Sequence, residues 1–234
     1  MIEIRNVKKE YRSGEKSFFA LNGVSLEIGE GEFVAITGKS GSGKSTLLNM
    51  IGTLDTVTEG NIFVDGQDIA HFTGKQIAEF RNRTVGFVFQ SFYLEPSYTV
   101  YDNVELPLVL SGSVGKKNRE RVEGALKAVN LSEKITEKAR NLSGGEQQRV
   151  AIARAIVNNP AYILADEPCG NLDSANSENI MRILKELHAA GKTIVMVTHD
   201  PEDAQKAERI VTMSDGKVAN DTKRMLDEIE AKSA

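Results

Sequence analysis

The chain has 234 residues, of which 40% are hydrophobic and 26% are charged, so it can bury the core of one large α/β domain. Its net charge of −4 provides no overall basic surface for nucleic acid, and its single cysteine excludes an intramolecular disulfide and fits a reducing compartment. The first residues alternate like a strand rather than a signal peptide and no apolar run is long enough to span a bilayer, so we expect any membrane association to go through a partner.

The N-terminal quarter has the pattern of antiparallel strands. Strand-like runs cover Ile2–Val7 and Phe18–Ile28, and the polar residues Tyr11–Lys16 between them predict a turn. Further on, Asn61–Val64 followed by Asp65-Gly66 indicates a hairpin. We therefore expect antiparallel strands at the start of the chain.

Helical spacing dominates the middle of the chain. A helix is expected over Lys75–Arg81, and a buried strand over Val85–Phe89 ends at Gln90. From residue 91 to about residue 159 no convincing strand pattern is found. We therefore predict a helical insert there.

Strand character returns in the last third. The runs Ala161–Ala165 and Thr193–Thr198 do not alternate, which is typical of central parallel strands covered on both faces. Between them Ala175–Ala190 predicts a helix, whereas Arg209–Met213 is expected to start a closing hairpin. The charged end, Asp221–Lys232, is expected to form an exposed helix.

One glycine-rich stretch has the spacing of a phosphate-binding loop, G-x-x-x-x-G-K-[ST]. An apolar strand, Phe33–Ile36, precedes it and a helical run, Leu47–Ile51, follows, a context that a flexible Gly/Ser linker would not have. Its backbone N–H groups and the helix N-terminus suit phosphate oxygens, with Lys44 on the β- and γ-phosphates and Ser45 on Mg²⁺. The candidate nucleotide-binding residues of this loop are Gly38, Lys39, Ser40, Gly41, Ser42, Gly43, Lys44, Ser45 and Thr46.

Two carboxylates follow the buried run Tyr162–Ala165. Asp166 ends that strand, where ligands bind in sheets of this kind, and is expected to hold Mg²⁺ directly or through water. Glu167 is the next residue, so its side chain points elsewhere and can act as general base on an attacking water. The alternative for Asp166 and Glu167 is a strand end with solvated charges, which the upstream phosphate loop disfavours.

Two further strand ends carry polar candidates. Gln90 can contact Mg²⁺ or the attacking water, although a lone Gln at a strand end often faces solvent. His199 ends the run Thr193–Thr198 and can donate a hydrogen bond to the γ-phosphate.

The stretch Leu142–Arg149, called the signature stretch below, combines a helix cap with two glycines. Ser143 and Glu146 have the spacing of a capping box, which alone would indicate only a well-capped helix. Gly144 and Gly145 also leave N–H groups bare at the helix N-terminus, which favours an anion. Because the stretch lies on the helical insert, we expect a second copy of the chain to present it to the phosphates.

The motifs together resemble the nucleotide-binding subunit of ATP-binding cassette (ABC) transporters, over essentially the whole chain. They occur in the family's order, with Asn171–Asp173 between the two carboxylates and His199. The resemblance implies an α/β fold: a P-loop NTPase core with a mixed sheet, an N-terminal antiparallel β-subdomain and an inserted α-helical subdomain. Within a single ABC ATPase domain, 1–234, residues 1–90 and 160–234 form the core and β-subdomain, and residues 91–159 form the helical subdomain.

The same resemblance assigns roles to individual residues. It implies that Tyr11 stacks on adenine, that Gln90 is the Q-loop glutamine and that His199 is the switch histidine. Ser143, Gly144 and Gly145 are expected to contact the γ-phosphate held by the opposite subunit, and Asp173 belongs to the D-loop between the two sites. ATP with Mg²⁺ would then be sandwiched between two subunits arranged head to tail.

The stretch from Asp166 to Ser174, with the signature stretch and Asn103–Leu108, resembles the branch that includes lipoprotein-release, macrolide-type efflux and antimicrobial-peptide export ATPases. Position 169, Cys169 here, is more often Thr in that branch. The expected function is ATP binding and hydrolysis that drives a separate membrane permease through ATP-dependent dimerisation. The expected partners are a second copy or a homologous ATPase subunit and the permease, with no nucleic acid, at the cytoplasmic face of the membrane.

Three alternatives share some of these motifs. An ABC-type ATPase that regulates cell-division or cell-wall machinery without transport would carry the same catalytic residues. A soluble ABC ATPase of DNA repair or translation usually has two cassettes or long coiled-coil inserts, which this chain lacks. A nucleotide kinase would not need the signature stretch.

Overall fold

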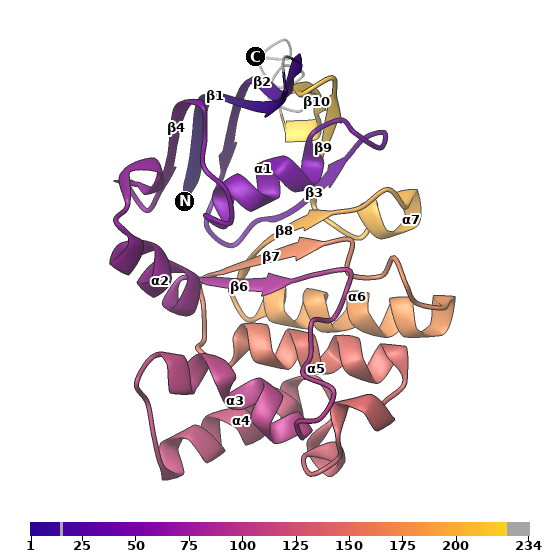
Figure 1. Ribbon diagram of the computed structural model, residues 1–234. Helices are drawn as coiled ribbons and strands as arrows, with labels where there is room; N and C mark the ends of the chain where they lie inside the picture. The colour runs from indigo at the N-terminus through magenta and orange to yellow at the C-terminus, as the bar shows by residue number, and fades with distance from the viewer. Residues whose placement is uncertain (15, 224–234) are drawn as a thin grey trace, which may run out of the picture. The chain divides into compact units, whose positions relative to one another are not determined.

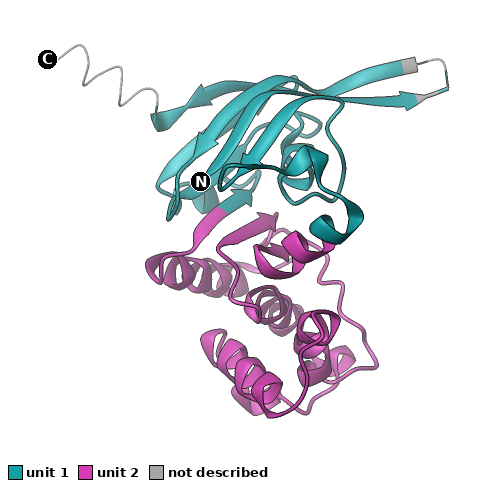
Figure 2. Cartoon of the chain, turned by 90° about the vertical axis from the view of Figure 1, so that its left-hand side faces the viewer, with its two compact units in different colours: residues 1–77, 195–234 teal, residues 78–194 magenta. Residues whose placement is uncertain are grey.

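The computed structural model describes residues 1–14 and 16–223, and its chain divides into two compact units (Figure 2). Unit 1 contains residues 1–77 and the chain from residue 195 onward, and unit 2 contains residues 78–194. No helix in the described part of the chain is both long and apolar enough to cross a membrane.

Unit 1 contains a four-stranded antiparallel sheet with the order β2-β1-β4-β5. Its strands are β1 (Ile2–Ser13), β2 (Lys16–Ile28), β4 (Glu59–Val64) and β5 (Gln67–Asp68). Ile4 of β1 lies opposite Leu26 of β2 and Ile62 of β4, and all three side chains are buried. The antiparallel start predicted from the sequence is confirmed, but Tyr11 lies within β1, so the turn predicted over Tyr11–Lys16 is wrong in its extent.

The second sheet of unit 1 carries the glycine-rich loop. It has the order β10-β9-β3-β8, formed by β3 (Phe33–Thr37), β8 (Thr193–Val197), β9 (Arg209–Ser214) and β10 (Lys217–Asp221). β8 begins in unit 2 and ends in unit 1. β3 runs parallel to β9, and β9 pairs with β10 as the predicted closing hairpin. The helical elements that begin in this unit are α1 (Lys44–Ile51), the 3₁₀ turn η1 (Ile69–His71), α2 (Gly74–Arg83) and α7 (Pro201–Ala204).

Unit 2 combines parallel strands with a group of helices. Its strands have the order β8-β7-β6, and β6 (Val85–Val88) runs parallel to β7 (Tyr162–Asp166). Its helical elements are α3 (Val100–Leu110), α4 (Lys116–Ala128), the 3₁₀ turns η2 (Ser132–Lys134) and η3 (Ala139–Asn141), α5 (Gly144–Ile156) and α6 (Ser174–Ala189). α3, α4 and α6 each pack against α5 (Figure 1). Residues 91–159, all of them described, contain helices and one isolated β-bridge but no strand, as predicted.

The predicted C-terminal helix begins one residue later than expected. Asp221, expected to begin an exposed helix, is the last residue of β10 and is buried. Thr222 and Lys223 are helical, and the rest of the predicted helix, from residue 224 onward, lies outside the described residues. Asp221 is buried because it pairs with a buried cation on the neighbouring strand.

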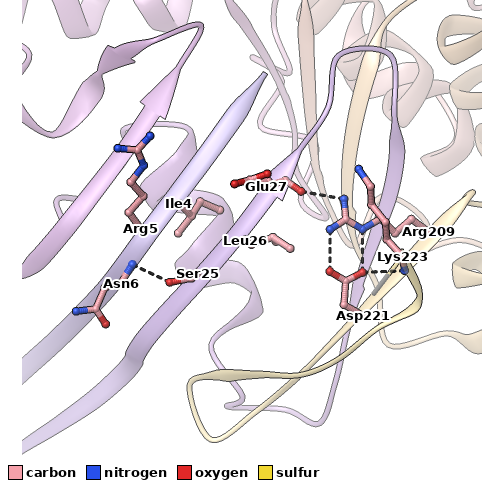
Figure 3. A pocket seen from close by; sticks show the side chains of 9 residues that line it. All are labelled: Ile4, Arg5, Asn6, Ser25, Leu26, Glu27, Arg209, Asp221 and Lys223. Atoms are coloured by element: carbon pink, nitrogen blue, oxygen red, sulfur yellow. Dashed lines mark hydrogen bonds and ion pairs between the residues drawn. The ribbon is translucent and has the colours of Figure 1, made fainter. Parts of the chain in front are cut away.

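That cation is Arg209, which is 8% exposed and joins three strands of unit 1. Its Nε and Nη2 donate to the two carboxylate oxygens of Asp221 (2.9 and 2.7 Å), and its Nη1 donates to the carbonyl of Glu27 and to Glu32 Oε2 (2.8 Å each). Lys223 donates to the other oxygen of Glu32 (2.9 Å). Arg209, Asp221 and Lys223, with Glu27, are among the residues that line a pocket of about 480 Å³ (Figure 3).

The cluster keeps its members charged. Burial favours the neutral carboxyl of Glu32, but hydrogen bonds from Lys223 and Arg209 outweigh it and lower the pKa of Glu32 from its ordinary value. Burial likewise opposes the charge of Arg209, yet the hydrogen bonds to Asp221 and Glu32 raise its pKa. The cluster is thus a network of ion pairs that bond to one another.

Substituting Asp221→Ala is expected to lower the free energy of unfolding by about 3–5 kcal/mol, because it leaves the buried guanidinium of Arg209 without its bidentate partner. Urea denaturation followed by circular dichroism measures the change. Asn220→Ala is the matched control, since Asn220 is the exposed neighbour on the same strand and is expected to change stability by no more than about 0.5 kcal/mol. Equal midpoints for the two variants would contradict a stabilising role for the cluster.

Candidate functional site

Unit 1 holds the glycine-rich loop between β3 and α1. Gly38 and Gly43 have φ angles of 142° and 99°, a region that favours glycine. A Cβ atom on Gly38 would lie 2.2 Å from the carbonyl oxygen of Met213, and one on Gly43 would lie 2.4 Å from that of Ala20. The loop therefore fits against its neighbours only with glycine at both positions.

Polar groups are buried inside this loop. Lys44 is 7% exposed, and its Nζ donates hydrogen bonds to the carbonyl oxygens of Gly38 (2.9 Å) and Lys39 (3.0 Å). Ser42 Oγ is buried and has no hydrogen-bond partner in the part of the chain that the structure describes. Gly43 precedes α1 as its N-cap and, having no side chain, supplies no side-chain cap for the first N–H groups of this helix. A buried ammonium, a hydroxyl without a partner and uncapped N–H groups together fit the oxygens of a phosphate chain.

Tyr11 lies close to the helix that follows the loop. Its hydroxyl donates to Asp55 Oδ2 (2.8 Å), and it also shares a hydrogen bond with the side chain of Thr46. Unit 1 thus brings Tyr11 next to a residue of the phosphate loop. His199, the other candidate of this unit, follows β8 on an exposed turn that leads into α7.

Unit 2 positions the two candidate carboxylates. Asp166 is the last residue of β7 and is half-buried. Glu167 follows it with a φ of 45°, a left-handed conformation that costs a residue with a side chain on the order of 1–3 kcal/mol. The chain then turns back, since Gly170 N–H donates to the Glu167 carbonyl (3.0 Å). The backbone therefore leaves the direction of β7 at Glu167.

Gln148 ties together the segments that carry Gln90 and Glu167. It is fully buried on α5, and its Nε2 donates to the carbonyl oxygens of Phe89 (3.1 Å) and Pro168 (2.7 Å). Phe89 immediately precedes Gln90, and Pro168 immediately follows Glu167. One side chain therefore sets the spacing between the backbones beside two candidate site residues.

Gln90 also forms a reciprocal amide pair. Its Nε2 donates to Asn171 Oδ1 (3.5 Å), and Asn171 Nδ2 donates to the Gln90 carbonyl (3.2 Å). Gln90 is half-buried, so the alternative of a glutamine that only faces solvent does not describe it. The segment after β6 is thereby joined to the loop after β7.

The signature stretch begins α5 with the predicted capping box. Ser143 Oγ accepts from the N–H of Glu146 (3.4 Å), and Glu146 Oε2 accepts from the N–H (2.8 Å) and hydroxyl (2.9 Å) of Ser143. The hydrogen bond from the Ser143 N–H lowers the pKa of Glu146, so this carboxylate stays ionised near neutral pH. Ser143 and Gly144 are exposed on the surface of unit 2, although the N–H of Ser143 is engaged by Glu146.

Gly145 is packed against the first turn of α6. A Cβ atom on Gly145 would lie 2.0 Å from Asn176 Oδ1. Asn176 is held in place by Asp173, which accepts from its backbone N–H (2.8 Å) and its Nδ2 (2.9 and 3.1 Å). Glycine at position 145 is thus required for the signature stretch to lie against the Asp173 cap.

The sequence candidates are divided between the two units. Tyr11, Gly38–Thr46 and His199 belong to unit 1, whereas Gln90, Ser143–Gly145, Asp166, Glu167 and Asp173 belong to unit 2. Sequence reasoning assigned no role to Gln148, Asn171, Asn176 or Asp55. Gln148 lies in the signature stretch and Asn171 lies in the motif Asn171–Asp173, and these positions were the only sequence signal for a role. Their hydrogen-bond partners become apparent only from contacts between distant segments.

Comparison with known proteins shows which family has this arrangement of motifs. The family model described as "ABC transporter" matches residues 21–170. The ATP-binding protein YknY of Bacillus subtilis is 51% identical over 219 residues, which are 93% of this chain and 95% of that protein. The macrolide export ATP-binding/permease protein MacB of Chlorobaculum tepidum is 50% identical over 224 residues, 96% of this chain but only 34% of MacB. The chain therefore spans about a third of the MacB relatives and nearly the whole of YknY.

A solved structure has the same fold. The dimeric structure of MJ0796, a bacterial ABC transporter cassette, superposes with a TM-score of 0.88 at 47% identity and covers 94% of this chain and 97% of that one. A second MJ0796 dimer, in a post-hydrolysis state bound to ADP and phosphate, gives a TM-score of 0.87 at 46% identity. The fold predicted from the sequence is confirmed by these structures. The family match, the close relatives and the shared fold show that this chain belongs to the ABC transporter family, as one of its ATP-binding cassettes.

Proposed function

We propose that the chain is the ATPase subunit of an export-type ABC transporter and drives a separate membrane permease by ATP-dependent dimerisation. The observation that carries the proposal is the exposed N-terminus of α5, where Ser143 and Gly144 follow the geometry of a capping box and remain accessible to a second molecule. The dimeric state of the related MJ0796 cassette supports a second copy as the partner. MacB, whose name joins an ATP-binding part to a permease, supports a permease as the other partner.

The phosphate loop binds the ATP phosphates. The Lys44 ammonium lies inside the loop and donates to two backbone carbonyl groups. Charged phosphate oxygens are stronger hydrogen-bond acceptors for an ammonium than these carbonyl groups are. The Ser42 hydroxyl and the N–H groups at the start of α1 add donors. Tyr11 stacks on the adenine, and Lys39, Ser40, Gly41 and Thr46 complete the loop around the phosphates.

Ser45, Gln90 and Asp166 would hold Mg²⁺ together with phosphate oxygens. Their hydroxyl, amide and carboxylate oxygens are the hard donors that suit this ion, and one or two carboxylates are the usual number beside a nucleotide. The ion supplies neutralisation of the charge on the β- and γ-phosphates.

Hydrolysis follows from positioning and electrostatics. Glu167 accepts a proton from the attacking water, and it stands where the backbone turns out of β7. Gln90 contacts the ion or that water, Lys44 stabilises charge on the transferred group and His199 donates a hydrogen bond to the γ-phosphate. Since phosphoryl transfer requires little covalent help, these four residues act by positioning and charge, together with Mg²⁺ and the groups of a second copy.

The second copy completes each site. Ser143, Gly144 and Gly145 of one subunit contact the γ-phosphate on Lys44 of the other, with Asp173 between the two sites. Loss of the γ-phosphate removes this bridge, and the pair opens. Residues 1–90 and 160–234 form the nucleotide-binding core and β-subdomain of one ABC ATPase domain, and the helical subdomain, 91–159, passes the motion to the permease.

We propose export of a drug, peptide or lipoprotein as the transport class, and the MacB relatives, which are named for macrolide export, support export. In that role the cassette lies at the cytoplasmic face of the membrane, bound through the permease. The relatives support this transporter function over regulation of cell-division or cell-wall machinery without transport.

Mixing two inactive variants tests the composite site. Lys44→Ala disables the phosphate loop and Ser143→Arg disables the signature stretch, so each variant alone is expected to have no ATPase activity. A dimer of one copy of each retains one site made only of wild-type parts, and mixing is expected to restore hydrolysis, measured as phosphate release. Doubling the concentration of either variant alone is the control. Absence of activity in the mixture, with both variants folded, would overturn the proposal.

A further inference from the structure

Asp55 connects two residues of β1 to the segment that follows the phosphate-binding helix. It lies just beyond the end of α1, where its Oδ2 accepts the hydroxyl proton of Tyr11 (2.8 Å). Its Oδ1 accepts from Lys9 Nζ (2.6 Å) and from the N–H of Thr56 (2.7 Å). Both oxygens of the carboxylate are thus engaged, and one of them anchors the Tyr11 ring.

Lys9 holds Asp55 in place from below the ring. Lys9 is only 8% exposed, and its Nζ also donates to the Thr56 carbonyl (2.7 Å). The same ammonium lies 5.0 Å from the centroid of the Tyr11 ring, close enough for a cation–π interaction. On another side Phe18 lies 5.6 Å away, centroid to centroid, at 36° to the ring.

The network favours a fixed, neutral phenol. Partial burial raises the pKa of Tyr11, and the hydrogen bond to the Asp55 carboxylate raises it further. Burial also opposes the charge on Asp55, but hydrogen bonds from Lys9, Thr56 and Tyr11 outweigh it and lower the pKa of Asp55. Tyr11 remains half-exposed, so part of the ring is accessible to a ligand.

We propose that Asp55 is a positioning residue for nucleotide recognition: through the hydroxyl of Tyr11 it fixes the ring that the adenine base stacks on. This inference rests on the proposed function, because it needs Tyr11 to contact the base. Stacking is strongest when the ring already has the orientation found in the complex, since no freedom of the side chain is then lost on binding. Thr46 lies in the first turn of α1 and Asp55 lies beyond its C-terminal end, so the interactions of the Tyr11 hydroxyl with both place the ring next to the helix that follows the phosphate loop.

Binding of two ligands separates the base subsite from the phosphate loop. ATP uses both, whereas inorganic tripolyphosphate uses only the loop. Isothermal titration calorimetry with the full chain measures both affinities. Asp55→Ala is expected to weaken ATP binding about tenfold, because it removes a hydrogen bond to a charged group, whereas the affinity for tripolyphosphate is expected to stay within about twofold of the wild-type value. In steady-state kinetics KM for ATP rises while kcat stays nearly constant.

A double-mutant cycle shows whether Asp55 acts through the Tyr11 hydroxyl. Tyr11→Phe keeps the ring and removes the hydroxyl, so Asp55→Ala is expected to have little further effect on ATP binding in that background. Asp55→Asn keeps an acceptor for the Tyr11 hydroxyl and is expected to lose less ATP affinity than Asp55→Ala. It replaces Asp55→Ala in the cycle if the Ala variant does not fold. Lys8→Ala is the matched control, because Lys8 neighbours Lys9 but pairs with Glu59 (2.7 Å).

The outcomes distinguish the two levels of the proposal. If Tyr11→Ala binds ATP as tightly as the wild type, the base contact in the proposed function is wrong and the inference falls with it. If Tyr11→Ala weakens ATP binding but Asp55→Ala does not, only the inference is overturned. Equal losses for ATP and tripolyphosphate in Asp55→Ala, or an undiminished effect of Asp55→Ala in the Tyr11→Phe background, would also overturn it.

Discussion

Replacing the carboxylate of Glu167 by an amide is expected to leave ATP binding intact, to lower kcat about 10²- to 10⁴-fold and to trap an ATP-bound dimer. An amide cannot accept the proton of the attacking water, but it keeps the size of the side chain and the left-handed turn at this position. Because the γ-phosphate then persists, the bridge between Lys44 of one copy and Ser143 of the other persists with it. Size-exclusion chromatography with light scattering in the presence of ATP measures the dimer, and phosphate release measures turnover.

Glu178→Gln is the matched control for this experiment. Glu178 is an exposed residue of α6 in the same unit, so the substitution makes the same change of charge away from the candidate site. The control is expected to hydrolyse ATP at the wild-type rate and to show no stable dimer after turnover. A Glu167→Gln variant that stays monomeric with ATP would count against the composite site, and one with wild-type turnover would remove Glu167 from the role of general base.

The parts of the fold that sequence reasoning predicted correctly are those with local causes. The conformation of the loop Gly38–Thr46 could be predicted from its glycines. A loop with positive φ angles and close backbone contacts must have glycine at fixed positions. The capping box of Ser143 and Glu146 spans four residues and formed as predicted. The burial of runs without alternation, such as Tyr162–Ala165, can also be predicted from the sequence, because a strand covered on both faces has no polar side.

The parts that it missed depend on contacts between distant segments. Asp221 looks like the first residue of a charged helix, and only Arg209, 12 residues earlier, explains why its carboxylate is buried in a strand. Tyr11 sits among polar residues that suggest a turn, but pairing with Phe18 on β2 extends the strand beyond it. Such pairing outweighs local propensity, which is weak for strands in general.

The candidate site shows the same division. Motif spacing made Glu167 and Ser143 candidates, and their proposed roles follow from the type of residue and its place in the motif. Gln148 has no catalytic or ligand-binding role that the motif would predict. It matters because the fold brings the carbonyl groups of Phe89 and Pro168 to its buried side-chain amide. A residue that holds others in place is therefore harder to predict than a residue that reacts.

Lys44→Ala is expected to weaken ATP binding at least about a hundredfold, since it removes charge-assisted hydrogen bonds to two phosphate groups, each worth about 1.5–3 kcal/mol. Calorimetric titration with ATP measures the loss, with Lys75→Ala, an exposed lysine of α2, as control. Lys44 also donates to the carbonyl groups of Gly38 and Lys39, so part of the effect could come from a collapsed loop. The melting temperature without nucleotide separates the two causes: an unchanged value together with lost affinity assigns the loss to the ammonium, whereas normal affinity contradicts the phosphate-loop role.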